Sequence, residues 1–276
     1  MSNTMSPVLK WAGGKGQLLD RLTARMPETY NRFFEPFVGA GAFFLYLAPH
    51  EAIINDINLQ LVNVYMQLRD NNGALIDRIN ELDSIPGSKE RYYELRKQYN
   101  DLVMSGELSV DTAALMIWIN KHCFNGLYRV NAKGGFNVPY NNKETGPSMD
   151  EANVAAIGQY LSTHNVEIMC TDFVTACEGV TEGDFVYFDS PYVPVSKTAD
   201  FTSYTKDGFT YEDHVRLAEL FKELDKRGAK LMLSNNDVPL VYELYDGYNI
   251  QSTDVQRAIN SDSKKRKSKE LIITNY

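Results

Sequence analysis

The sequence has few cysteines and no long apolar run, and each absence excludes a class of protein. Its 276 residues include three cysteines, Cys123, Cys170 and Cys177. Cys170 and Cys177 could form half of a zinc site in principle, but no histidine or further cysteine lies near them in sequence, so we expect reduced, buried thiols and no metal. No stretch of about 18 apolar residues exists and no apolar core follows the first residues, which predicts a cytoplasmic protein without a membrane span or signal peptide.

Positive charge is also scarce in the chain as a whole. Lysine and arginine number 28 against 36 aspartates and glutamates, which gives a formal net charge of -8. This balance is not typical of a protein that binds nucleic acid. One segment departs from it, because five of the six residues from Lys264 to Lys269 are cationic. Such a run is usually a solvated loop, yet a basic strip on an acidic protein can also contact a phosphate backbone.

Two segments near the N-terminus predict the start of a parallel α/β sheet. Residues 33–37 read as a buried strand, Gly39 and Gly41 follow as a turn, and residues 42–48 are expected to be helical. This order is similar to the first unit of a nucleotide-binding sheet. The third glycine of a dinucleotide-binding loop is missing, so a compact adenosine ligand is favoured.

A second predicted strand, residues 52–56, ends in Asp56. This carboxylate lies 17 residues after Gly39, close to the spacing at which an acidic residue accepts hydrogen bonds from ribose hydroxyls. Asp56 could equally cap the helix expected to begin near Leu59.

The segment from Lys10 to Lys15 contains Gly13 and Gly14 and precedes a short amphipathic helix. A glycine-rich turn at a helix N-terminus suits an anionic group such as a carboxylate, although a simple tight turn explains it as well.

Residues 59–155 interrupt the alternation of strands and helices. Their pattern predicts helices over 59–69, 74–82, 89–104 and 110–123, and a helical block between strands of one sheet indicates an inserted domain. The remaining residues, 1–58 and 156–276, would then form one discontinuous α/β domain.

The inserted block ends in a predicted β-hairpin around Lys133, Gly134 and Gly135. Arg129 and several asparagines alternate along it. A β-ribbon fits the major groove of DNA, and arginine reads guanine there through two hydrogen bonds. A solvated hairpin with no ligand is the alternative interpretation.

The sheet is expected to resume with the strand 166–170, which is followed by Asp172 and Phe173. An acid and an aromatic ring at a strand end could hold the edge and face of an adenine, or Asp172 could only cap a helix. Further on, a helix is predicted over 210–226, a strand over 229–233, and two closing strands over 250–255 and 271–274.

The stretch from Asp189 to Tyr192 follows an apolar strand, residues 184–188. Pro191 cannot donate to a sheet ladder and therefore ends that strand. A carboxylate, a main-chain carbonyl and an aromatic ring then meet at the carboxyl end of a strand, where α/β proteins bind ligands, although Asp-Ser-Pro is also ordinary turn chemistry. Two adjacent acceptors could take both protons of an amino group and direct it at the methyl group of S-adenosylmethionine.

Six motifs in this order resemble the Dam family of DNA adenine methyltransferases, from about residue 7 to the C-terminus. They are Lys-Trp-Ala-Gly-Gly-Lys from residue 10, Phe-Glu-Pro-Phe-Val-Gly-Ala-Gly from 34, Ile-Asn-Asp from 54, Phe-Asn-Gly-Leu-Tyr-Arg from 124, Phe-Asn-Val-Pro-Tyr from 136 and Asp-x-Pro-Tyr from 189. The resemblance implies a Rossmann-like methyltransferase sheet with helices on both faces and an inserted, mostly helical target-recognition domain. It also implies methylation, from S-adenosylmethionine, of a flipped-out adenine in double-stranded DNA, with GATC as the expected site.

Together the patterns and the resemblance give the expected site residues. Catalysis is assigned to Asp189, Ser190, Pro191 and Tyr192, and cofactor contacts to Trp11, Lys15, Gly39, Gly41, Asp56, Asp172, Phe173 and Asp189. DNA contacts are assigned to Asn125, Leu127, Arg129, Asn131, Pro139, Tyr140, Lys264, Lys265, Arg266 and Lys267. We expect a monomer or weak dimer in a bacterial or phage-infected cell.

Two positions depart from the family pattern. The family usually has proline where Ser190 stands, and many relatives have Gly-Arg where Asn141 and Asn142 stand. The second change removes a cation near the DNA. Ser190 suggests one alternative, a catalytically weakened DNA-binding relative. Methylation of an RNA base is another, since related tetrapeptides occur in RNA methyltransferases.

Overall fold

The computed structural model describes residues 5–142, 146–193, 208–256 and 267–276. Within these ranges it has one seven-stranded sheet in the order β3-β2-β1-β4-β5-β7-β6. The strands are β1 (Phe33–Glu35), β2 (Glu51–Asn55), β3 (Asn165–Met169), β4 (Phe185–Phe188), β5 (Lys230–Asn236), β6 (Asn249–Gln256) and β7 (Lys267–Thr274). The first five strands are parallel, and β7 runs antiparallel to both β5 and β6. The predicted α/β class is confirmed.

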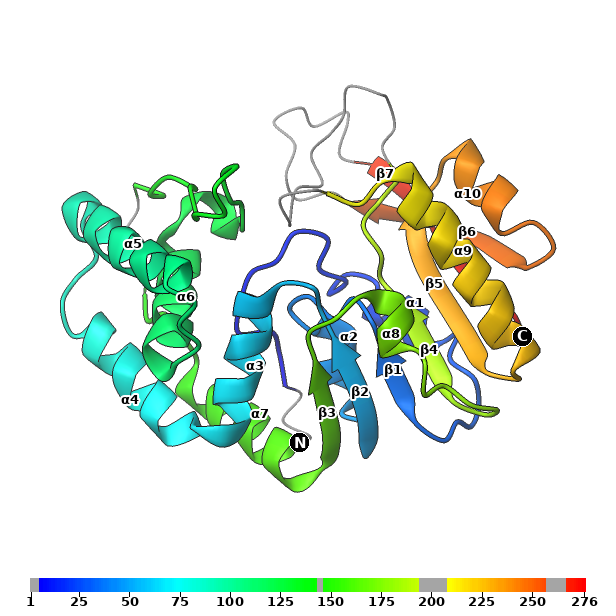
Figure 1. Cartoon of the computed structure of the whole chain (residues 1–276), viewed down its shortest axis with the longest axis horizontal. Coiled ribbons are helices and arrows are strands. Elements are labelled where there is room, and N and C mark those ends of the chain that lie inside the picture. Colours follow the sequence, from blue (N-terminus) through cyan, green and yellow to red (C-terminus); the bar gives the residue numbers. More distant parts are fainter. Residues whose placement is uncertain (1–4, 143–145, 194–207, 257–266) are drawn as a thin grey trace.

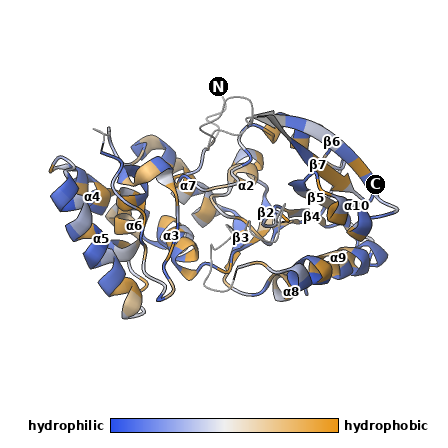
Figure 2. Ribbon diagram, turned by 90° about the horizontal axis from the view of Figure 1, so that it is seen from above, coloured by the Kyte–Doolittle hydropathy of each residue, from blue (hydrophilic) through white to orange (hydrophobic). Residues whose placement is uncertain are grey.

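Helices cover both faces of the sheet. The α-helices of the described ranges are α1 (Leu19–Thr23), α2 (Ala42–Leu47), α3 (Leu59–Asp70), α4 (Asn72–Asp83), α5 (Lys89–Met104), α6 (Val110–His122), α7 (Glu151–Thr163), α8 (Phe173–Ala176), α9 (Tyr211–Lys226) and α10 (Pro239–Leu244). Figure 2 shows α8 and α9 on one side of the sheet and α2 on the other. None of these helices combines the length and apolarity needed to cross a bilayer.

The alternation of side chains along β1 and β4 divides the core between the two faces. Phe33 and Tyr187 pack in one cluster with Phe43 of α2. Phe34 and Phe188, the next residues along each strand, pack in a second cluster with helix α9. Because neighbouring side chains of a strand point to opposite faces, a wholly apolar strand can serve both clusters. Burying each phenylalanine side chain contributes on the order of 2 kcal/mol.

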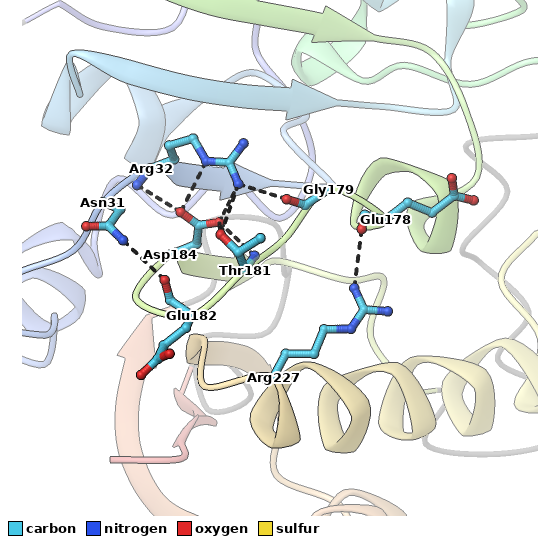
Figure 3. Close-up of polar contacts among 8 residues, drawn as sticks. All are labelled: Asn31, Arg32, Glu178, Gly179, Thr181, Glu182, Asp184 and Arg227. Carbon is cyan, nitrogen blue, oxygen red and sulfur yellow. Dashed lines mark hydrogen bonds and ion pairs between the residues drawn. The ribbon is translucent and has the colours of Figure 1, made fainter.

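A polar cluster fixes the amino ends of β1 and β4, opposite the edge where ligands bind (Figure 3). Asp184 is fully buried and accepts hydrogen bonds from Arg32 Nη2 at 2.6 Å and from the Thr181 backbone N–H at 2.9 Å. Burial raises the pKa of Asp184, but these donors outweigh it and hold the pKa below its ordinary value. Asn31 donates to the Glu182 carbonyl beside this pair. The cluster ties the start of β1 to the start of β4.

Helices α4, α5 and α6 lie at the end of the molecule away from β6 and β7 (Figure 1). Helix α6 packs against α3, α4 and α5, whereas α3 and α7 also contact β3. The expected domain boundary at residue 155 falls inside α7, a continuous helix over Glu151–Thr163. Helix α7 packs on α3 and α4 as well as on β3, so it joins the helical block to the sheet.

Several element boundaries differ from those expected. Strand β1 ends at Glu35 rather than at residue 37, because Pro36 cannot continue the ladder. Asn58, and not Asp56, caps α3 and accepts from Gln60 and Leu61. The expectation of three buried thiols is wrong for Cys170, which is exposed, whereas Cys123 and Cys177 are buried.

The predicted hairpin is a loop held by isolated bridges and not by continuous strands. Antiparallel bridges join Cys123 to Tyr140 and Val130 to Phe136, and a short 3-10 turn, η1 (Phe124–Gly126), begins the loop. The backbone nevertheless reverses around Lys133 and Gly134 as expected, with the Asn131 N–H donating to the Gly135 carbonyl at 2.9 Å.

Candidate active site

The candidate site lies at the carboxyl ends of β1 and β4. The strand order reverses between these two neighbours, and the crevice at such a switch point is where open α/β sheets bind ligands. A cavity of about 730 Å³ opens there, within the size range of small-molecule sites. It is lined by all eleven residues to which catalysis or cofactor binding was assigned: Trp11, Lys15, Gly39, Gly41, Asp56, Asp172, Phe173, Asp189, Ser190, Pro191 and Tyr192.

The turn after β1 requires both of its glycines. Gly39 and Gly41 have φ of 51° and 73°, in the left-handed region that side chains disfavour. A Cβ on Gly41 would lie 2.5 Å from the Tyr65 hydroxyl oxygen, and one on Gly39 would lie 3.1 Å from the Trp11 ring. The Tyr65 hydroxyl in turn donates to the Gly39 carbonyl at 2.9 Å. The main chain can therefore line the cavity directly.

Asp56 anchors the same turn from the end of β2. Its carboxylate accepts from the Gly39 N–H at 3.1 Å and from the Asn58 N–H at 2.9 Å. Desolvation raises the pKa of Asp56 to about 6, and the two backbone donors limit that rise. The expected helix cap is thus replaced by a bridge between two loops at the cavity.

Lys15 lies at the centre of a buried charge cluster. Its ammonium is 2.9 Å from Asp189 Oδ1 and 2.7 Å from Glu270 Oε1, and it donates to the Tyr192 hydroxyl at 3.0 Å. Burial lowers the pKa of Lys15, but the two carboxylates and Tyr192 outweigh it and raise the pKa well above its ordinary value. Lys15 is therefore charged and fixed in position.

The carboxylate of Asp189, which follows β4, has a second acidic neighbour in Glu35. Burial raises the pKa of Asp189 to about 6, even though Lys15 acts in the opposite direction. Glu35, at the end of β1, is 2% exposed, and its Oε2 is buried without a hydrogen bond among the described residues. Burial and the neighbouring charge of Asp189 raise the pKa of Glu35 well above its ordinary value. Among the described residues, no side chain satisfies this oxygen in the cavity wall.

Asp172 and Phe173 lie at the start of α8 and also line the cavity. Asp172 caps that helix by accepting from the Val174 N–H at 3.0 Å and pairs with Arg216 at 2.9 Å. The Phe173 ring packs against Phe37, with 5.3 Å between ring centroids. Capping by Asp172 is confirmed, and Phe173 offers an aromatic edge to the cavity.

The N-terminal loop connects the cavity to the helical block. Trp11 stacks on Tyr128 with centroids 4.9 Å apart. The Lys10 backbone exchanges two hydrogen bonds with the side chain of Asn120, at 2.9 and 3.0 Å, and Asn120 also donates to the Gly126 carbonyl. Through these contacts the loop that begins with Phe124 is held beside the cavity entrance.

Most candidates for DNA contact in this loop are accessible. Asn125, Arg129, Asn131 and Pro139 are exposed, and Leu127 is half-buried. Arg129 Nε donates to Asn137 Oδ1 at 2.7 Å, which aligns the guanidinium along the loop. Asn131 has a structural task as well, because its Oδ1 accepts from the Lys133 and Gly135 N–H groups and closes the turn.

Tyr140 is placed differently from the expectation. It is 9% exposed, and its ring lies 5.4 Å from that of Tyr92. This burial argues against a direct DNA contact and favours a role in fixing the loop.

Of the basic run, Lys264, Lys265 and Arg266 lie outside the described residues, and Lys267 begins strand β7 rather than lying in a loop.

Sequence reasoning missed the side chains that support the site from β5 and β7. Glu270 follows the basic run and belongs to none of the motifs, but antiparallel pairing places it opposite Asn236. Ser234 and Asn235 lie beyond the strand expected over 229–233, whereas β5 extends to Asn236. Ser234 Oγ donates to Asp189 Oδ1 at 3.4 Å. The described residues contain no cluster of histidine, cysteine and acidic side chains that could hold a metal ion.

Comparisons with known proteins agree with this geometry. A model of the family described as D12 class N6 adenine-specific DNA methyltransferase matches residues 11–259. The type II methyltransferase M1.LlaDCHI of Lactococcus lactis subsp. cremoris is 45% identical over 273 residues, which cover 99% of this chain and 96% of that protein. The type II methyltransferase M.MjaIII of Methanocaldococcus jannaschii is 41% identical over 290 residues, 99% of each chain. The DNA adenine methylase of Escherichia coli K12 is 32% identical over 270 residues, 97% of this chain and 94% of that protein. The chain therefore belongs to the D12 class of N6 adenine-specific DNA methyltransferases, which transfer a methyl group from S-adenosylmethionine to adenine in DNA.

Proposed function

We propose that this enzyme methylates the adenine of GATC in double-stranded DNA and that Asp189 to Tyr192 form its catalytic segment. The observation that carries the proposal is the convergence, in one cavity, of this segment with the glycine turn after β1 and with Asp56. GATC is supported by the loop set Asn125, Leu127, Arg129 and Pro139, which resembles that of GATC-specific members of the family.

The chemistry of the cavity fits S-adenosylmethionine. The cofactor carries an ammonium that can donate hydrogen bonds, and the buried Glu35 Oε2 has no hydrogen-bond partner among the described residues. Asp56 would accept from the ribose hydroxyls, with Phe173 and Asp172 beside the adenine. When bound, the cofactor supplies an electrophilic methyl group.

The catalytic segment acts by accepting hydrogen bonds from the substrate amino group. Asp189 Oδ and the main-chain carbonyl of Ser190 would take its two N–H bonds, which keeps the nitrogen lone pair available and directed. Tyr192 would stack on the base. The base must leave the duplex to reach them, which costs a few kcal/mol.

Target recognition is proposed for the block between α3 and α7. Its loop, residues 124–140, would enter the major groove, with Arg129 reading a guanine and the basic run from Lys264 contacting phosphates. We propose that one protomer, or at most a weak dimer, suffices in the cytoplasm of a bacterial or phage-infected cell. Sedimentation of the protein with and without a duplex would test the oligomeric state.

Modification-sensitive sequencing of DNA from expressing cells tests the function directly. Methylated adenines confined to GATC are expected, with none in cells that express Asp189→Ala. Methylation at another sequence would refute the site assignment. Duplex binding without methylation would favour a weakened relative, the alternative suggested by Ser190.

A further inference from the structure

The catalytic segment has lost a source of rigidity that its family usually has. Proline fixes φ near -65°, whereas serine leaves this torsion free. Ser190 is nevertheless 2% exposed and lies between Asp189 and Pro191 in the cavity wall. Because residue 190 has no proline ring, contacts from other residues are needed to restrain the main chain there.

The side-chain amide of Asn235 supplies that constraint. Asn235 is 2% exposed and lies on β5, next to β4, whose last residue Phe188 pairs with Leu233. Its Nδ2 donates to Ser190 Oγ at 3.2 Å and to the Pro191 carbonyl at 3.5 Å. Its Oδ1 accepts from the Val193 N–H at 3.2 Å.

Asn235 Oδ1 also accepts from the Asn236 N–H at 2.9 Å. Both donor hydrogens and both acceptor positions of the Asn235 amide are thus used, so the amide cannot turn without breaking hydrogen bonds. Buried polar groups in such a network are costly to leave unpaired.

The neighbouring Asn236 forms a hydrogen bond with the same segment. Asn236 is 4% exposed, and its Nδ2 donates to the Val193 carbonyl at 2.8 Å. Consecutive side chains of a strand normally point to opposite faces. Because both asparagines reach the segment 190–193, this segment wraps around the end of β5.

We propose that Asn235 is a positioning residue for methyl transfer, and that its hydrogen bond to Ser190 Oγ replaces the restraint that proline gives in the usual family motif. Asn235 acts through the catalytic segment and does not touch the substrate. It keeps the Ser190 carbonyl and the Asp189 carboxylate in position to accept hydrogen bonds from the amino group of the adenine. The inference rests on the proposed catalytic role of residues 189–192.

A mutant cycle on the full-length protein tests this coupling. Ser190→Ala, Asn235→Ala and the double variant are compared with wild type by single-turnover transfer of labelled methyl groups to a GATC duplex at saturating S-adenosylmethionine. Ser190→Ala is expected to slow transfer about fivefold, the value of one buried hydrogen bond, with cofactor affinity changed less than twofold. The double variant should be no slower than Asn235→Ala alone, because the shared bond is already broken.

A fourth variant and a control separate positioning from stability. Ser190→Pro restores the restraint covalently. Asn235→Ala should therefore lower the rate of methyl transfer by a smaller factor in the Ser190→Pro variant than in wild type. Asn275→Ala serves as the matched control, since Asn275 Oδ1 accepts from Leu231 N at the other end of β5. It should lower the melting temperature while the rate of the folded enzyme stays unchanged.

The two hypotheses fail in different ways. An active wild type whose Ser190→Ala and Asn235→Ala losses multiply in the double variant would overturn the coupling and leave the proposed function intact. A wild-type rate for Ser190→Ala would do the same. A wild type that transfers no methyl group to any duplex would overturn the proposed function and this inference with it.

Discussion

The ammonium of Lys15 lies 2.9 Å from the carboxylate of Asp189, with the Lys15 side chain 3% exposed and the Asp189 side chain 20% exposed. One group comes from the N-terminal loop and the other from the end of β4, 174 residues later (189 minus 15). Lys15 therefore favours the ionised form of the proposed catalytic carboxylate, against the effect of burial. Several measurable properties depend on this pair.

Removing the Asp189 carboxylate should abolish methyl transfer. Asp189→Ala deletes the acceptor of one amino proton and leaves Lys15 paired with Glu270. Transfer of labelled methyl groups to duplex DNA should fall by at least about 100-fold, an effect typical of losing a well-placed electrostatic group. Circular dichroism should be unchanged. Asp101→Ala, at an exposed position on α5, is the control, and transfer by Asp189→Ala at close to the wild-type rate would exclude its assigned role.

The rate should rise with pH through about 6. Burial raises the pKa of Asp189 to about 6. Only the ionised carboxylate can accept hydrogen bonds from both the substrate amino group and the Lys15 ammonium. Below pH 6 the protonated form dominates and transfer should slow about tenfold for each further pH unit. Single-turnover rates between pH 5 and 8 measure this. A flat profile would mean that Asp189 does not titrate in this range.

Replacing the neighbours of Asp189 should move this profile in opposite directions. Lys15 lowers the pKa of Asp189 and Glu270 raises it. Lys15→Met should therefore shift the acidic limb to higher pH, and Glu270→Gln should shift it to lower pH. Equal shifts of the same sign would contradict the charge cluster and would point to a general loss of structure, which melting curves would reveal.

Truncating Arg129 should relax the choice of DNA sequence. Arg129→Ala removes the proposed contact to guanine and should cost about 1–3 kcal/mol of discrimination between GATC and duplexes changed at one guanine. Lys97→Ala on α5, whose side chain is 78% exposed, is the control for general loss of positive charge. The measurement is kcat/KM on matched duplexes, and an unaltered preference would remove Arg129 from the recognition role.

Adding one methyl group at Gly41 should destabilise the protein. Gly41→Ala combines a left-handed backbone with a Cβ only 2.5 Å from the Tyr65 hydroxyl oxygen. The free energy of unfolding should fall by about 1–3 kcal/mol, and S-adenosylmethionine binding should weaken. Gly73→Ala is the matched control, because Gly73 lies in helix α4 with no atom within 4 Å of the added carbon. Thermal unfolding and calorimetry with the cofactor compare the two variants, and equal stability of both would refute the strain at Gly41.

Local chemistry made much of the site predictable. Gly39 and Gly41 mark a turn that only glycine adopts easily, Pro191 ends β4, and the apolar run before Asp189 forms a strand buried on both faces. These features depend on torsions and on hydrophobic patterning, which neighbouring residues determine. The sequence therefore predicted the α/β class and, with the family resemblance, eleven of the residues that line the cavity.

Contacts between distant segments could not be predicted in the same way. Glu270 enters the site through the register of β7 on β5, and Asn235 reaches Ser190 because β5 lies beside β4. Tyr140 is buried because Tyr92 of α5 packs on it. A sequence pattern records what each residue prefers, but not which strand becomes its neighbour. Motif order and backbone preference thus determined the fold class and the location of the chemistry. Only tertiary packing decided which buried charges and amides hold Asp189 and Ser190 in place, since burial and pairing arise when the sheet assembles.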